Sequence, residues 1–144
     1  MDRIYITVDV ETTGLEVGVD EIIEVAAVKF RADEVLETFS ELVQPHHTLP
    51  LNSARLTGIT PEMLEGAPRF SEIAPRLATF LKSYPLVGHN VHFDLRMLEA
   101  YGMRLPQPAY DTLELATLLL PRSPAYRLSA LSAALGITHD DAHR

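Results

Sequence analysis

Asp9 and Glu11 stand two residues apart after a short apolar run, and they are the first side chains in the sequence that could do chemistry. In an extended strand, residues i and i+2 point to one face, so both carboxylates would meet at the rim of a sheet, where α/β folds place ligands. Two such charges about 4 Å apart repel by roughly 4 kcal/mol at an effective dielectric near 20. Protonation of one acid, exposure of both to water, or a cation between them would relieve this repulsion.

A bare D-x-E pair also fits the solvated end of a strand. Here it is followed by Thr12, Thr13 and Gly14, a hydroxyl-rich turn that offers backbone N–H groups close to the acids. Hard oxygen ligands in a chain without cysteine suit Mg²⁺ or Mn²⁺ better than Zn²⁺. The segment therefore predicts a site for a divalent cation.

A second candidate is the segment 87–94 (VGHNVHFD), which follows a predicted strand and enters a predicted helix. Asp94 falls in the first helical turn, where a carboxylate can simply complement the helix dipole. Alternatively, Asp94 faces the same rim as Asp9 and Glu11 and adds a third oxygen ligand. Phe93 would ordinarily belong to the core, but an aromatic ring beside a metal site can also stack on a base.

The last residues, 139–144 (HDDAHR), contain His143, which in isolation is typical of an ordinary surface residue. The sequence has no G-x-S-x-G, P-loop or G-x-G-x-x-G pattern. Serine-hydrolase, P-loop nucleotidase and Rossmann functions therefore have no residues to support them.

Runs of β-branched and aromatic residues predict strands at 4–8, 22–30 and 35–43, the last with alternation at Leu36, Thr38, Ser40 and Leu42. The four-residue connection 31–34 predicts an antiparallel hairpin between the second and third strands. Apolar residues at helical spacing predict a helix over 70–81, ended by Pro85 and followed by a short strand at 86–88.

Asn90 can cap a further helix that runs to about Tyr101, with Leu95 and Leu98 inward and Gly102 at its end. Two shorter helices are predicted at 112–119 and 128–135, the second closed by Gly136. A strand hairpin followed by alternating strands and helices predicts an α/β fold, a mixed sheet with helices on its faces.

The composition describes one globular domain and argues against several classes of protein. The chain has 144 residues, is 47% hydrophobic, contains no cysteine and carries a formal charge of -8. No run approaches the ~20 apolar residues of a membrane span, and the N-terminus is not a secretory signal. A reducing cytoplasm fits the lack of cysteine. The acidic charge alone argues against nucleic acid, but all of the excess lies in residues 1–41, which contain Asp9 and Glu11.

The three candidate segments together resemble the motifs of the DEDDh exonucleases, relatives of the epsilon proofreading subunit of bacterial DNA polymerase III. The matching residues are DVETTGL at 9–15, HNVHFD at 89–94 and His143, in the family's order and spacing. Secondary features match as well, namely LTGIT at 56–60, DTL at 111–113, and LSAL at 128–131 before LGI at 135–137. The resemblance covers nearly the whole chain.

The resemblance implies a ribonuclease H-like fold with a five-stranded mixed sheet, and a two-metal phosphodiesterase that removes nucleotides from a 3′ end. Asp9, Glu11 and Asp94 would bind two Mg²⁺ or Mn²⁺ ions, and His143 would be the general base. The residues implied in substrate binding are Val10, Thr12, Thr13, Gly14, Leu15, Leu56, Thr57, Ile59, His89, Asn90 and Phe93. Among these, Leu15 would wedge beside the terminal base.

One position departs from the family pattern, in which an Asp five residues after the His supplies a fourth metal ligand. The chain stops one residue after His143, and Asp140 and Asp141 precede that His, so they do not replace the ligand by position. Two explanations are open: the sequence is a fragment of a longer chain, or the protein is a degenerate member of the family. We expect the first, in which residues 1–144 are a single exonuclease domain cut short within its third motif. On this expectation they alone would bind metal weakly and degrade DNA poorly.

The sequence leaves several functions open. The first is a 3′–5′ exonuclease acting on single-stranded DNA 3′ ends in proofreading or repair, as a subunit or as a domain fused to a polymerase or helicase. An RNA 3′-end exonuclease of the same family is a second, because the motifs do not distinguish the two sugars. A non-catalytic module that binds nucleic acid or a partner is a third, and the complete set Asp9, Glu11 and Asp94 argues against it.

Overall fold

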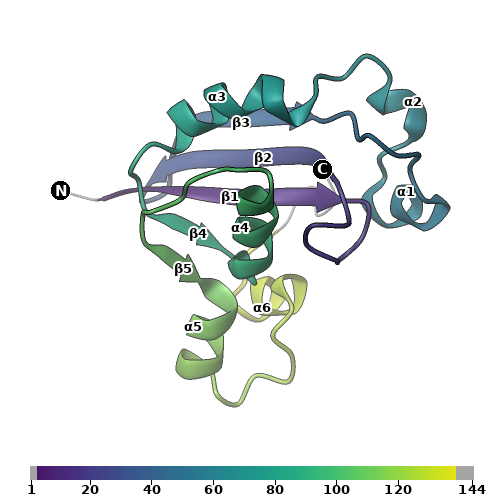
Figure 1. The fold of residues 1–144 in the computed structure, drawn as a ribbon. Coiled ribbons are helices and arrows are strands. Elements are labelled where there is room, and N and C mark those ends of the chain that lie inside the picture. Colours follow the sequence, from purple (N-terminus) through teal and green to yellow (C-terminus); the bar gives the residue numbers. More distant parts are fainter. Residues whose placement is uncertain (1–2, 139–144) are drawn as a thin grey trace.

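A five-stranded sheet forms the centre of the molecule (Figure 1). The computed structural model of the chain describes residues 3–138. The strands lie in the order β3-β2-β1-β4-β5. Their bounds are β1 Ile4–Thr12, β2 Ile22–Arg31, β3 Glu34–Leu42, β4 Leu86–Gly88 and β5 Ala109–Asp111. The helices are α1 Leu51–Thr57, α2 Pro61–Leu64, α3 Phe70–Leu81, α4 Val91–Ala100, α5 Thr112–Leu119 and α6 Leu128–Ala134.

The sheet is mixed, as the strand pattern predicts. β1 pairs with β2 and β2 with β3 in antiparallel fashion, which confirms the hairpin expected at 31–34. β1 pairs with β4 and β4 with β5 in parallel fashion, and each of these connections passes through helices. The parallel ladder between β1 and β4 joins Ile6 to Leu86 and Thr7 to Val87, whereas β1 itself continues to Thr12. The last residues of β1 therefore extend beyond the short strand beside them.

β3 is an edge strand, and α3 covers only one of its two faces. Leu36, Thr38 and Ser40, which alternate in the sequence, are exposed. The other face of β3 lies under α3, where the Phe39 ring is 5.8 Å from that of Phe80. The alternation thus identifies the strand correctly. The face that α3 covers, however, is the one with Phe39 and not the one with Leu36, Thr38 and Ser40.

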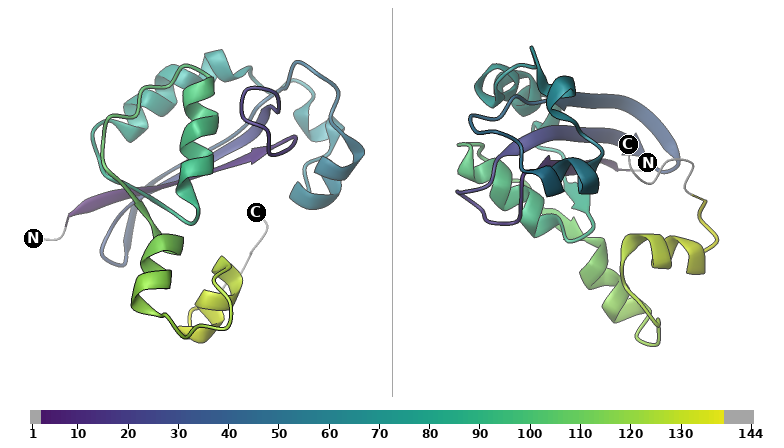
Figure 2. Two further views of the ribbon diagram at one scale, coloured as in Figure 1. Left: turned by 60° about the horizontal axis from the view of Figure 1, so that its bottom comes forward. Right: turned by 90° about the vertical axis from the view of Figure 1, so that its right-hand side faces the viewer.

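One face of the sheet carries the main hydrophobic core. Alternate residues of β1 (Ile6, Val8 and Val10) are buried against α3 and α4, which lie on the same side of the sheet (Figure 2, left). Leu77 of α3 and Leu98 of α4 belong to this core. α5 and α6 lie beyond β5, at the other end of the strand order from β3 (Figure 1).

The predicted helices are present, but one cap works differently from the expectation. α4 begins after Asn90 and ends at Tyr101 and Gly102, as predicted. Asn90 takes a left-handed conformation (φ 58°), and its side chain makes no capping hydrogen bond. Instead its backbone N–H donates to Asp111 Oδ1 at 2.9 Å. The α4 entry is therefore fixed by a neighbouring carboxylate and not by the Asn90 amide.

Two short helices and one short strand escaped the periodicity analysis. α1 and α2 span seven and four residues, and β5 spans three, too short to show a period. α1 lies beside the end of β1, and α2 follows it along the chain (Figure 1). A second, small apolar cluster of Ile23, Leu49, Ile59 and Leu64 holds them to the sheet.

Candidate active site

Three carboxylates meet where β1 runs past the end of β4. Asp9 and Glu11 lie on the face of β1 opposite Val8 and Val10. Asp94, in the first turn of α4, is buried, and its Oδ1 accepts a hydrogen bond of 2.9 Å from the Val10 backbone N–H. Because β4 stops short, this N–H has no strand partner in the β1–β4 register, and the carboxylate takes that place. One hydrogen bond thus brings the second motif against the first.

The three acids interact electrostatically, since the charge of one raises the pKa of another. Burial raises the pKa of Glu11 to about 7, and the charges of Asp9 and Glu24 contribute to the rise. Burial also raises the pKa of Asp94 to about 7, against the lowering effect of the Val10 N–H, and the charges of Asp9 and Glu11 add to the rise.

The pKa of Asp9 is raised as well, first by burial and then by the charge of Glu24. Asp9 keeps solvent-accessible surface, yet the protein atoms packed around its carboxyl remove part of its hydration. Its environment is therefore that of a partly desolvated group open to water on one side, which is where a ligand would approach.

Glu24 is a fourth carboxylate at this site that the sequence analysis missed. It lies on β2 directly opposite Glu11 in the antiparallel register, and its charge raises the pKa of both Glu11 and Asp9. Residues directly opposite each other in such a pair bring their side chains within about 5 Å. The sequence shows Glu24 as an acidic residue within the predicted second strand. Only the register of β1 and β2 places it opposite Glu11.

This donor set fits a hard divalent cation. The cluster offers carboxylate oxygens, and a cation would favour the ionised forms that burial and mutual repulsion now disfavour. The residues that could hold it are Asp9, Glu11 and Asp94. An apolar surface or a single carboxylate would not offer several oxygen ligands at one place.

The turn after β1 is held in place by its own side chains. Thr13 Oγ1 donates to Asp20 Oδ1 at 3.0 Å and accepts from the Glu21 backbone N–H at 2.9 Å. A Cβ on Gly14 would meet the Asp20 carboxylate at 2.5 Å, so a side chain here would push this carboxylate away from Thr13. The Thr13 hydroxyl is therefore engaged within the turn. Thr12 Oγ1 likewise donates to Gly14 O at 2.6 Å.

Glu21 anchors the segment that leads into α1, a role the sequence analysis did not assign. Its two carboxylate oxygens accept from the backbone N–H groups of His46 and His47 at 2.7 and 2.9 Å, and each lies 2.9 Å from the Nδ1 of one of these rings. Burial by itself raises the pKa of Glu21, but these hydrogen bonds outweigh it and lower the pKa to about 2. Ser53 of α1 then donates to Thr13 O, which ties α1 to the turn after β1.

The predicted substrate-binding residues of this region divide by exposure. Leu15 and Leu56 are 83% and 80% exposed, as a contact with a ligand requires. Ile59 is fully buried in the small cluster, and the Val10 side chain lies in the main core. Their side chains therefore support the fold, and a ligand would meet their backbone at most. Thr57 Oγ1 donates to Ser53 O within α1.

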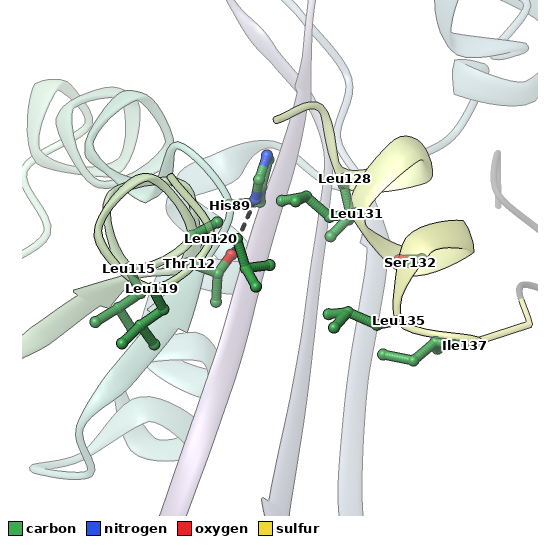
Figure 3. A pocket seen from close by; sticks show the side chains of 11 residues that line it. His89, Thr112, Leu115, Leu119, Leu120, Leu128, Leu131, Ser132, Leu135 and Ile137 are labelled. Atoms are coloured by element: carbon green, nitrogen blue, oxygen red, sulfur yellow. Dashed lines mark hydrogen bonds between the residues drawn. The ribbon is translucent and has the colours of Figure 1, made fainter. Parts of the chain in front are cut away.

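The residues of the second motif point to different places. His89 Nδ1 lies 3.0 Å from Thr112 Oγ1, and this hydroxyl donates to Gly88 O, so His89 Nδ1 carries the proton in this arrangement. His89 lies at one wall of an apolar cavity of about 390 Å³ between α5 and α6 (Figure 3). Asn90 is exposed, and Phe93 is half-buried against the main core.

His143 lies outside the described residues, as do Asp140 and Asp141. The predicted general base therefore stays a prediction. Within residues 3–138, no helix is long and apolar enough to cross a membrane.

Comparisons with known proteins identify the family of the chain. The exonuclease family RNase_T matches residues 6–144. The DNA polymerase III PolC-type of Oceanobacillus iheyensis is 38% identical over an alignment of 145 positions, which covers 97% of this chain and 10% of that protein. The 3′-5′ exonuclease DinG of Bacillus subtilis is 35% identical over an alignment of 146 positions, which covers 97% of this chain and 16% of that protein. The chain thus spans a small part of the length of these relatives.

Solved structures share the overall fold of the chain. A structure of exonuclease X in complex with 5′ overhanging duplex DNA has a TM-score of 0.79 and 26% identity, and covers 94% of this chain and 75% of that one. A structure of exonuclease I has a TM-score of 0.80 at 22% identity and covers 98% of this chain and 37% of that one, which shows the shared fold. The expected ribonuclease H-like sheet is confirmed. With the family match over nearly its whole length, the chain belongs to the RNase_T exonuclease family.

Proposed function

We propose that residues 1–144 belong to one 3′–5′ exonuclease domain, which hydrolyses phosphodiester bonds at DNA 3′ ends with two Mg²⁺ or Mn²⁺ ions. The observation that carries this proposal is the 2.9 Å bond from Val10 N–H to Asp94 Oδ1, because it joins the two motifs into one carboxylate cluster. The name of the similar Bacillus subtilis protein, a 3′-5′ exonuclease, supports the polarity.

Each residue of the cluster has a defined task in this proposal. Bound divalent cations would supply Lewis-acid chemistry, lowering the pKa of a water molecule and neutralising charge on the phosphate. Asp9, Glu11 and Asp94 hold these ions, and the Val10 N–H fixes the orientation of Asp94. Glu24, opposite Glu11, adds negative charge and so strengthens the demand for cations. His143 takes the proton of the attacking water.

The binding of the strand end rests on exposed residues of the turn after β1 and of α1. Leu15 and Leu56 present exposed apolar side chains on segments tied together by the Ser53–Thr13 hydrogen bond. In our proposal they contact the terminal base, with Thr12, Thr13, Gly14 and Thr57 forming the backbone around it. His89, Asn90 and Phe93 approach from the start of α4. Ile59 and Val10 act through the backbone.

DNA is the substrate favoured by the comparisons. A similar solved structure contains duplex DNA with a 5′ overhang, and the similar proteins include a DNA polymerase. These relatives are far longer than the chain, which supports a domain that works within or beside a polymerase or helicase. A cytoplasmic location follows from that role. RNA is the second substrate class, because the motifs do not distinguish the two sugars.

The test compares Asp94→Asn with Asp33→Asn in the intact protein, on 5′-labelled single-stranded DNA and a matched RNA, with Mn²⁺ and with a chelator. The amide of Asp94→Asn keeps an oxygen for the Val10 N–H but loses the charge, so we expect stepwise 3′ shortening to slow by about a hundredfold or more. Asp33, exposed in the β2–β3 turn, serves as the control. Full activity of Asp94→Asn would overturn the proposal. Preferential cleavage of the RNA would show that RNA, and not DNA, is the substrate.

A further inference from the structure

A second group of metal-binding side chains lies where α4 and α5 begin, outside the carboxylate cluster of β1. It consists of His92, Asp111 and Glu114, each of which offers one ligand atom within 4.8 Å of the other two. These residues come from the first turn of α4, the end of β5 and the first turn of α5. We propose that they form a binding site for a transition-metal ion of the Zn²⁺ type.

Asp111 is the fixed ligand of this site. It is 5% exposed, and its Oδ1 accepts two hydrogen bonds of 2.9 Å, one from the Asn90 N–H and one from the Leu113 N–H. Within the described residues its Oδ2 receives no hydrogen bond. A carboxylate held through one oxygen presents the other in a set direction, as carboxylates at metal sites are held by surrounding donors.

The Glu114 side chain does not make the hydrogen bond that is usual for a Glu at its position in α5. It is the third residue of α5, where a Glu side chain usually bonds back to the N-cap backbone. Here its Oε1 instead lies 3.6 Å from His92 Nε2. This separation is close to the ~3.4 Å between two ligands of a tetrahedral ion with bonds of about 2.1 Å. The two exposed side chains are free to move the short distance that closes the site on Asp111.

The chemistry of the three ligands selects the ion. A neutral imidazole with two carboxylates supplies two negative charges, which balance a divalent cation and outweigh the positive end of the α5 dipole. Mg²⁺ prefers an octahedron of oxygens, whereas imidazole nitrogen suits Zn²⁺ and Co²⁺. A bound ion would join the first turn of α4, which carries Asp94, to α5.

The test is a Co²⁺ titration followed by visible absorption, in the intact protein with Asp9→Asn and Glu11→Gln and in excess Mg²⁺. These conditions suppress Co²⁺ binding at the carboxylate cluster, so the signal reports the second site. We expect one Co²⁺ per chain, displaced by Zn²⁺. His92→Ala should abolish the band, Glu114→Gln should weaken binding about tenfold or more, and Glu99→Gln, an exposed Glu of α4, should change nothing.

Folding does not confound the result, because His92 and Glu114 are both exposed and each variant can be checked by its unfolding temperature without metal. Zn²⁺ should raise that temperature in the parent and not in His92→Ala. Unchanged titrations in either His92→Ala or Glu114→Gln would overturn the proposed three-ligand site, as would equal weakening in Glu99→Gln.

Discussion

Alternate side chains of β1 face two different environments. Ile6, Val8 and Val10 are buried in the main core under α3 and α4, whereas Asp9 and Glu11 project from the other face among acidic groups. The core face lowers the free energy of the folded state through apolar burial. The acidic face raises it, because desolvated like charges disfavour ionisation. One face of this nine-residue strand therefore stabilises the fold through apolar burial, and the other face destabilises it through the repulsion of acids that could bind a cation.

The sharpest test of this difference is Glu11→Gln. If Glu11 holds a catalytic cation, the neutral amide should lower exonuclease turnover by about a hundredfold or more. The same change should raise the free energy of unfolding without metal by about 1 kcal/mol, because one charge leaves a repulsive cluster. Turnover and denaturant unfolding measure the two effects, with Glu65→Gln as an exposed control. Normal turnover, or a clear loss of stability, would contradict the division of roles.

The acidic face should also give the metal-free protein an unusual pH dependence. The pKa of Glu11 and of Asp94 is about 7 in the folded state, above the ordinary values of 4.5 and 3.8, so the folded state binds more protons than the unfolded state between those values and 7. Stability must therefore fall as pH rises through this window, by about 2–4 kcal/mol between pH 5 and pH 8.

Mn²⁺ should reverse this trend, because it binds the ionised carboxylates. Its stabilising effect should be larger at pH 8 than at pH 5, as measured by the unfolding temperature at both pH values with and without the ion. The Glu11→Gln variant should show a shallower loss with pH. Metal-free stability that rises from pH 5 to pH 8 would show that the carboxylates do not form the repulsive cluster described here.

The core face should respond to a substitution that leaves the acids alone. Val8→Ala removes two methyl groups from a buried position and should lower the free energy of unfolding by about 1–2 kcal/mol. Val35→Ala makes the same change on exposed edge strand β3 and should cost less than about 0.5 kcal/mol. Turnover of folded Val8→Ala should stay near that of the parent. Equal costs at the two positions, from urea unfolding, would argue against the packing of β1 on α3 and α4.

Much of the fold and of the site was predictable because the signals are local. Short β-branched runs predicted four of the five strands, and the helical spacing of apolar residues predicted α3 through Leu81. Asp9 and Glu11 could be placed on one face because strand residues alternate. The elements that were missed are α1, α2 and β5, which are too short for a period and are held by tertiary contacts such as the cluster around Ile59.

The sequence by itself determined the types and spacing of the reactive side chains and which residues of an element share a face, because both depend on the period of the backbone. The tertiary structure decided which of these side chains meet. The short ladder of β4 leaves the Val10 N–H for Asp94, the register of β2 sets Glu24 opposite Glu11, and the approach of α4 to α5 gathers His92, Asp111 and Glu114. These meetings depend on strand register and helix placement, which residues far apart in the chain fix jointly through packing and hydrogen bonds.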